Sequence, residues 1–155
     1  MQNARVEQTG ILIDDKGDWF SKDKKKIINT EILTYFKKNL HRDDSGVFIF
    51  NEFGKLAEKG YIVIEGPPLM VVSFDHENIF LDNGEKQNIV ETSFFWGPGD
   101  RPLIIYNPLN VWAGFQRQAY QNLATRLHER GTVIHFEEKN IHILTSIDWK
   151  NPKRQ

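Results

Sequence analysis

The stretch NTEILTYFKKNLHRDDSGVFIFN, residues 29–51, decides the fold of this chain. The apolar side chains of its first half recur near the 3.6-residue period, which predicts a helix with one apolar face. Asn29 or Thr30 can cap the start of this helix. The acidic, glycine-ending segment 43–46 then turns the chain. The apolar run 47–50 predicts a strand that is covered on both of its faces.

A second helix is predicted between Asn107 and Gly131. Asn107 is of a residue type that caps helices, Pro108 suits the first helical position, and Gly131 is placed like a residue just past a helix end. Apolar residues at every third or fourth position from Val111 to Leu127 complete the pattern of one buried stripe. The helices are expected to bury four large side chains against sheet, namely Phe36, Leu40, Phe115 and Leu123.

Short apolar runs around both helices predict strands, joined by loops too short for crossover connections. The strongest hairpin signal is Asn83-Gly84. We therefore predict an α+β fold of two similar halves, residues 10–75 and 76–147. Each half has one helix on a curved antiparallel sheet, and together they form a structural repeat within one compact unit.

The composition narrows the classes of function. Of 155 residues, 39% are hydrophobic and 12% aromatic, which is enough to form a core without a metal or disulfides. Twenty basic and 21 acidic residues leave a net charge of −1, which argues against a general nucleic-acid-binding protein. The absence of cysteine excludes disulfides and thiolate metal sites, and favours a cytoplasmic location. The sequence shows no signal peptide and no apolar run that could span a membrane.

The segment FFWGPGDR, residues 94–101, is the first candidate for a binding site. The two glycines, Pro98 and the following Pro102 predict that residues 95–102 form a surface loop that cannot pair as a strand, with Trp96 at its base. Asp100 and Arg101 are expected to face water. A rigid aromatic residue beside an adaptable loop suits recognition without catalysis. A cleft between the two halves is the other candidate surface.

The last hairpin carries a polar set that suggests a different class of function. If Lys139 and Asn140 form a two-residue turn, Glu137 lies opposite His142, and His135 shares their face. Two imidazoles and a carboxylate could bind zinc or perform acid–base chemistry. A small metal-assisted enzyme is therefore the alternative to a non-catalytic binding protein, although the solvent-exposed face of an antiparallel sheet would show the same pattern of polar residues.

Two other motifs give weaker indications of a functional site. The triplet at residues 41–43, His-Arg-Asp, matches a kinase catalytic loop only in spelling, since the rest of the kinase signature is missing. It is expected to lie at the end of the first helix. Four lysines within residues 22–26 could contact phosphate, but a single short cluster is weak support for such a patch, and a solvated loop is the favoured interpretation.

The first half resembles a family of bacterial proteins catalogued as domain of unknown function family 1285. The matching residues are Asp18, Trp19, Phe20, Ile27, Ile32, Phe36, Leu40, Arg42, Asp43, Gly46, Phe48, Val63, Glu65 and Pro68. Two positions depart from the family pattern, because Asn29 lies where an arginine is expected and Gly66 where an aspartate is expected. The resemblance implies a repeated helix-and-curved-sheet fold with no established activity and a suggested role in signalling, and it supplies no catalytic residues to transfer to this sequence.

These observations favour a non-catalytic binding or regulatory module that needs no cofactor. Its partner is expected to be a protein or a small molecule.

Overall fold

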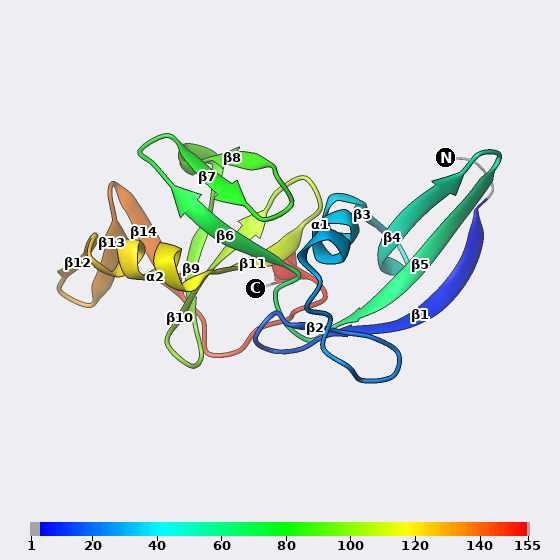
Figure 1. Cartoon of the computed structure of the whole chain (residues 1–155). Coiled ribbons are helices and arrows are strands. Elements are labelled where there is room, and N and C mark those ends of the chain that lie inside the picture. The colour runs from blue at the N-terminus through cyan, green and yellow to red at the C-terminus, as the bar shows by residue number, and fades with distance from the viewer. Residues whose placement is uncertain (1–3, 155) are drawn as a thin grey trace. The chain divides into compact units, whose positions relative to one another are not determined.

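A computed structural model describes residues 4–154 of the chain. The protein divides into two compact units, the first ending at Pro68 and the second beginning at Leu69 (Figure 1). The chain is mostly β-structure, with 49% of residues in strands and 15% in helices. The predicted α+β fold with a helix covering each half is therefore wrong, because both units are built from large sheets to which short helices are added.

The first unit contains a five-stranded sheet with the strand order β2-β1-β5-β4-β3, and the helix α1. Its elements are β1 (Arg5–Ile13), β2 (Trp19–Phe20), α1 (Thr30–Lys38), β3 (Leu40–Asp43), β4 (Gly46–Phe53) and β5 (Leu56–Ile64). The polar segment after residue 51 is the tip of the long hairpin formed by β4 and β5.

Helix α1 begins where the sequence predicts. The side-chain oxygen of Asn29 accepts a 3.0 Å hydrogen bond from the backbone N–H of Ile32, which satisfies one of the free donors in the first turn. The helix ends at Lys38, earlier than predicted, because the next residues pair with β4 as strand β3. Its contacts with the rest of the unit include a stacked ring pair between Phe36 and Trp19, with centroids 6.1 Å apart.

The second unit contains a nine-stranded sheet with the strand order β12-β13-β14-β9-β10-β11-β6-β7-β8, together with α2 and two 3₁₀ turns. Its strands are β6 (Leu69–Phe74), β7 (Asn78–Leu81), β8 (Lys86–Asn88), β9 (Phe94–Gly97), β10 (Arg101–Tyr106), β11 (Val111–Phe115), β12 (Leu127–Arg130), β13 (Val133–Phe136) and β14 (Lys139–Ile143). The helical elements are η1 (Ile89–Glu91), α2 (Arg117–Ala124) and η2 (Pro152–Arg154).

Helix α2 is much shorter than the predicted helix. It begins at Arg117 and packs against β6 and β11 (Figure 1). The expected N-terminal turns of this helix are instead strand β11, all five residues of which are buried between β10 and β6. A fully buried strand needs apolar side chains on both faces, so its sequence also matches the helical spacing. Gly131 is not a helix cap but has a φ of 69° in the turn that joins β12 and β13.

Both sheets are mixed rather than antiparallel. In the first unit, β1 pairs in parallel with β5, which is the last strand of the run α1-β3-β4-β5. In the second unit, β9 pairs in parallel with β14, which is the last strand of the run α2-β12-β13-β14. Both units thus contain the same arrangement. A first strand (β1 or β9) is followed later in the chain by a helix and three antiparallel strands, and the last of these three pairs with the first strand.

The cores contain most of the residues expected there. Leu40, Phe115 and Leu123 are buried, whereas Phe36 is only half-buried. Strand β4 is covered on both faces at residues 47–49, as predicted. Within the described part of the chain, no helix is long and apolar enough to cross a bilayer.

Candidate functional site

The segment predicted as an unpaired loop is a tight hairpin. Strands β9 and β10 are antiparallel, and their last paired residues are Gly97 and Arg101. Only three residues lie between these two. Gly99 and Asp100 have φ values of 80° and 53°, the left-handed conformation in which glycine and aspartate are tolerated best. The prediction that residues 95–102 cannot pair as a strand is therefore wrong at both ends of the segment.

Asp100 holds two aromatic side chains at this turn. Its carboxylate Oδ1 accepts a 3.4 Å hydrogen bond from the indole Nε1 of Trp96, and its backbone carbonyl accepts one of 3.3 Å from the hydroxyl of Tyr120. The two rings lie with centroids 6.1 Å apart, and both side chains are half-buried. Asp100 itself is exposed. We name Trp96, Asp100 and Tyr120 the aromatic rim.

Arg101 does not join Trp96 at this rim. It pairs with Gly97, and side chains of successive strand residues point to opposite faces, so Arg101 and Trp96 lie on different faces of the sheet. The Arg101 guanidinium lies over the Trp149 ring, 4.7 Å from its centroid. Trp149 in turn packs edge-on against the buried Trp112. The structure thus divides the residues proposed for one site between two faces.

The register of the last hairpin differs from the predicted one. His135 pairs with Asn140, and Lys139 belongs to the paired strand rather than to the turn. Glu137 lies in the turn with a φ of 54°. The predicted pairing of Glu137 with His142 is therefore wrong, because the turn lies two residues earlier in the sequence than the apolar pattern suggested.

The observed register aligns a histidine that sequence reasoning missed. His128 on β12 lies directly opposite His135 on β13. His142 lies on the same face and packs against the ring of Phe95, with centroids 5.3 Å apart. Across residues 4–154, however, no three histidine or carboxylate side chains are close enough to hold a metal ion. The structure therefore does not bring His135, Glu137 and His142 together as a set of metal ligands.

A polar cluster in the first unit was also missed. The carboxylate Oδ2 of Asp43 accepts hydrogen bonds from the hydroxyl of Tyr61 at 2.5 Å and from Nζ of Lys59 at 3.2 Å. Burial raises the pKa of Asp43, but the hydrogen bonds from Tyr61, Lys59 and the Ser45 N–H outweigh it and hold this pKa below its ordinary value of 3.8. The hydrogen bond to Asp43 also raises the pKa of Tyr61.

This cluster contains part of the His-Arg-Asp triplet of residues 41–43, which was expected at the end of the first helix. His41 and Asp43 lie on strand β3, and the His41 ring stacks on Phe48 with centroids 5.6 Å apart. The ammonium of Lys59 lies 4.9 Å from the centroid of the same phenylalanine ring. No spacing rule could have revealed the cluster, because its members are on three strands and meet only when the sheet forms.

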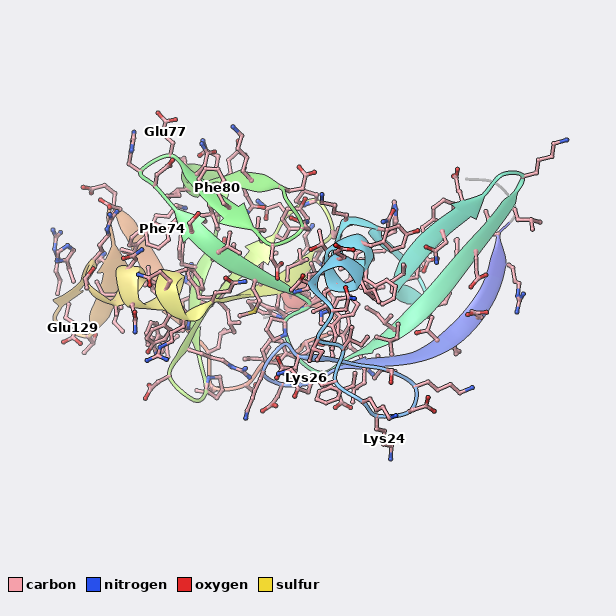
Figure 2. All side chains as sticks on the ribbon, viewed as in Figure 1. Lys24, Lys26, Phe74, Glu77, Phe80 and Glu129 are labelled. Atoms are coloured by element: carbon pink, nitrogen blue, oxygen red, sulfur yellow. The ribbon has the colours of Figure 1, made fainter. Side chains whose placement is uncertain are left out.

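The lysine-rich segment before α1 is a loop whose lysines differ in their surroundings. Nζ of Lys26 lies 3.5 Å from a carboxylate oxygen of Asp18. The side chain of Lys22 packs over Gly10, so closely that a Cβ there would lie 2.8 Å from Lys22 Cγ. Lys24 is exposed and points away from the loop (Figure 2). The loop therefore does not present all four charges together to a phosphate backbone.

A shallow groove of about 410 Å³ runs along α1. It is lined by Thr30, Glu31, Thr34, Tyr35 and Lys38. Since all of these come from a single helix, the groove does not gather groups from different elements as a catalytic pocket does.

No protein-family model and no curated protein sequence matches this chain. Among solved structures, a DUF1285 family protein from Silicibacter pomeroyi DSS-3 is similar over 92% of this chain and 84% of its own, with a TM-score of 0.65 and 14% identity. A DUF1285 family protein from Shewanella baltica OS155 is similar over 74% of this chain and 90% of its own, with a TM-score of 0.53 and 21% identity. At such identities the likeness concerns the fold and not the activity. The resemblance inferred from the sequence is confirmed at that level: the chain is similar in fold to DUF1285 family proteins.

Proposed function

We propose that this protein is a non-catalytic binding module with a regulatory or signalling role, and that the aromatic rim is its recognition surface. The observation that carries the proposal is the position of Asp100. A single turn residue fixes the polar tips of both Trp96 and Tyr120. Half-buried aromatic side chains that are already held in place lose little conformational freedom when they bind a partner.

The chemistry of the rim favours a partner segment that carries a cation beside an apolar side chain. The faces of the Trp96 and Tyr120 rings attract lysine or arginine through their quadrupoles. The exposed carboxylate of Asp100 adds a negative charge at the same place. An apolar neighbour of the cation would cover the remaining ring surface. A basic, partly apolar peptide is therefore the ligand class that we propose.

Three broader properties belong to the same proposal. The shared order of elements in the two units, with Leu40-His41 and Leu127-His128 each beginning the first strand after the helix, supports a structural repeat. The lack of cysteine supports a cytoplasmic location. A net charge of −1 disfavours nucleic acid as the partner.

The proposal can be tested with a peptide library displayed on phage and selected against the wild-type protein. The affinity of a selected basic peptide is then measured for Trp96→Ala, Tyr120→Ala and Asp100→Asn, with circular dichroism to show that each variant is folded. We expect each change to weaken binding about tenfold or more, since anchoring residues commonly contribute about 2 kcal/mol.

Arg101→Ala provides the matched control, because Arg101 lies on the opposite face of the same hairpin. It should leave the affinity within about twofold of wild type if the rim is the site. Loss of binding in Arg101→Ala with full binding in Trp96→Ala would move the site to the other face. Selection of acidic peptides only would refute the proposed ligand class.

A further inference from the structure

Strand β1 has an open edge over most of its length. On its inner side it pairs with β5, but on its outer side β2 pairs only with Leu12 and Ile13. Lys22 packs against Gly10, next to the paired part of this edge. In the described part of the chain, no strand pairs with the outer edge of residues 5–9, which lies along the margin of the first sheet (Figure 1).

In the second unit, the strand that corresponds to β1 is paired on both of its edges. Strand β9 has the place of β1, since each pairs in parallel with the last strand of a helix-and-three-strand run. All four residues of β9 also pair with β10 on the other side. In the first unit, the corresponding place along residues 5–9 is open to an added strand.

The side chains along this edge would be complementary to those of a second, antiparallel copy of the same strand. Arg5 and Glu7 lie on one face, their side chains 75% and 37% exposed, with Nη2 and Oε2 3.4 Å apart. Val6 is 60% exposed on the other face. Charged residues on an edge strand usually prevent pairing. Here the charges have opposite signs, and they lie symmetrically about an apolar residue.

We infer that two copies of this chain associate through antiparallel pairing of their β1 strands, centred on Val6. This register places Arg5 of each copy opposite Glu7 of the other, and Ala4 opposite Gln8. Opposite charges directly across an antiparallel pair are favourable. Moving the centre to Glu7 would bring two carboxylates together, so charge selects the Val6 register. The inference is independent of the aromatic rim.

Charge reversal gives the first test, with analytical ultracentrifugation of the full chain over a concentration series at low salt. Arg5→Glu or Glu7→Arg alone would create like-charge pairs, and each should weaken dimerisation about tenfold. An equimolar mixture of the two variants restores both opposite-charge pairs, so a heterodimer of wild-type affinity should form. Glu129→Arg and Arg130→Glu, on the edge strand β12 of the other sheet, are matched controls that should leave dimerisation unchanged.

Single cysteines test the register, because the chain has no cysteine of its own. Val6 would lie opposite its own copy, within the Cα separation that a disulfide spans. Gln8 residues of the two copies would be four positions apart, or about 13 Å. Under mild oxidation Val6→Cys should therefore form a covalent dimer at least tenfold faster than Gln8→Cys. A wild-type protein that stays monomeric at every concentration would overturn the inference. So would single reversals without effect, a mixture that fails to associate, or equal cross-linking at both positions.

Discussion

Tyr61 donates a 2.5 Å hydrogen bond to Asp43, although the two residues lie on strands β5 and β3, which are separated by β4. Gly46 lies opposite Asp43 on the intervening strand and contributes no side chain to the space between them. The hydrogen bond therefore joins the outer strand of the sheet to the strand two positions away.

This bond predicts a pH-dependent stability. Because the pKa of Asp43 is lowered in the folded state, its ionised form stabilises the fold above the unfolded pKa, and this contribution is lost as pH falls through the folded pKa. Tyr61→Phe should raise the pKa of Asp43 and lower the free energy of unfolding near pH 7 by about 1 kcal/mol, since the side chain of Asp43 remains 29% exposed and solvent screens it. The difference from wild type should shrink near about pH 2. Carboxyl NMR titration and urea unfolding at both pH values measure these effects.

Tyr35→Phe is the matched control for this prediction. The Tyr35 hydroxyl donates a 2.7 Å hydrogen bond to the neutral side chain of Asn51. Its loss should lower stability by a similar or smaller amount at both pH values, because the accepting amide of Asn51 carries no charge. A Tyr61→Phe effect that is equally independent of pH would show that Asp43 does not depend on this bond.

Gln87 supports a second prediction, because it is a buried polar side chain with three hydrogen bonds. Its Nε2 donates to Thr92 Oγ1 at 2.8 Å and to the Ile105 carbonyl at 2.9 Å, and its Oε1 accepts from the Asn107 N–H at 2.9 Å. Gln87→Met keeps the length of the side chain and removes all three bonds. We expect a loss of about 3 kcal/mol in the free energy of unfolding, since buried groups left unsatisfied cost about 1–3 kcal/mol each.

Asn107→Ala distinguishes this effect from a general weakening of the region. It removes an exposed side-chain hydrogen bond to the Glu91 carbonyl but leaves the backbone N–H that Gln87 accepts. Its cost should be below about 1 kcal/mol. If both variants unfold at the same denaturant concentration, Gln87 is not the organising group that its contacts indicate. Hydrogen exchange at the Asn107 amide should accelerate only in Gln87→Met.

Local signals in the sequence predicted local structure well. Asn29 caps α1 through its own side chain, and Asn83-Gly84 lies in the turn between β7 and β8. The apolar residues 47–50 lie on a strand, β4, as predicted. These features depend on residues only a few positions apart, so a single stretch of sequence contains all the information that determines them.

Features that depend on distant residues were not predictable in the same way. Strand β11 matched a helix because burial on both faces replaces alternation with an apolar run. The aromatic rim was half-predicted: Trp96 was selected, but Tyr120 was assigned to the middle of a long helix and could not be placed beside it. The contact of Asp43 with Tyr61 and the parallel pairings of β1 with β5, β6 with β11 and β9 with β14 also required the complete sheets.

Gly66 explains one departure from the family pattern and supports the last prediction. It is buried after β5, against the turn that follows β1. A Cβ at this position would lie 1.7 Å from the carbonyl oxygen of Asp14. That turn cannot easily move, because the Asp14 carboxylate accepts hydrogen bonds from the N–H groups of Lys16 and Asp18. An aspartate, as the resemblance leads one to expect, would not fit here.

Gly66→Ala should therefore destabilise the protein by about 3 kcal/mol, the upper part of the range for overpacked sites, because rigid backbone rather than a flexible side chain must shift. Gly97→Ala is the matched control, since its Cβ would meet only the tips of Ile147 and Leu103, at 3.0 and 3.2 Å. These flexible ends can move aside, so the control should cost about 1 kcal/mol or less. Denaturant unfolding followed by circular dichroism measures both effects. Equal costs for the two variants would mean that the turn at Asp14 yields as readily as a side chain.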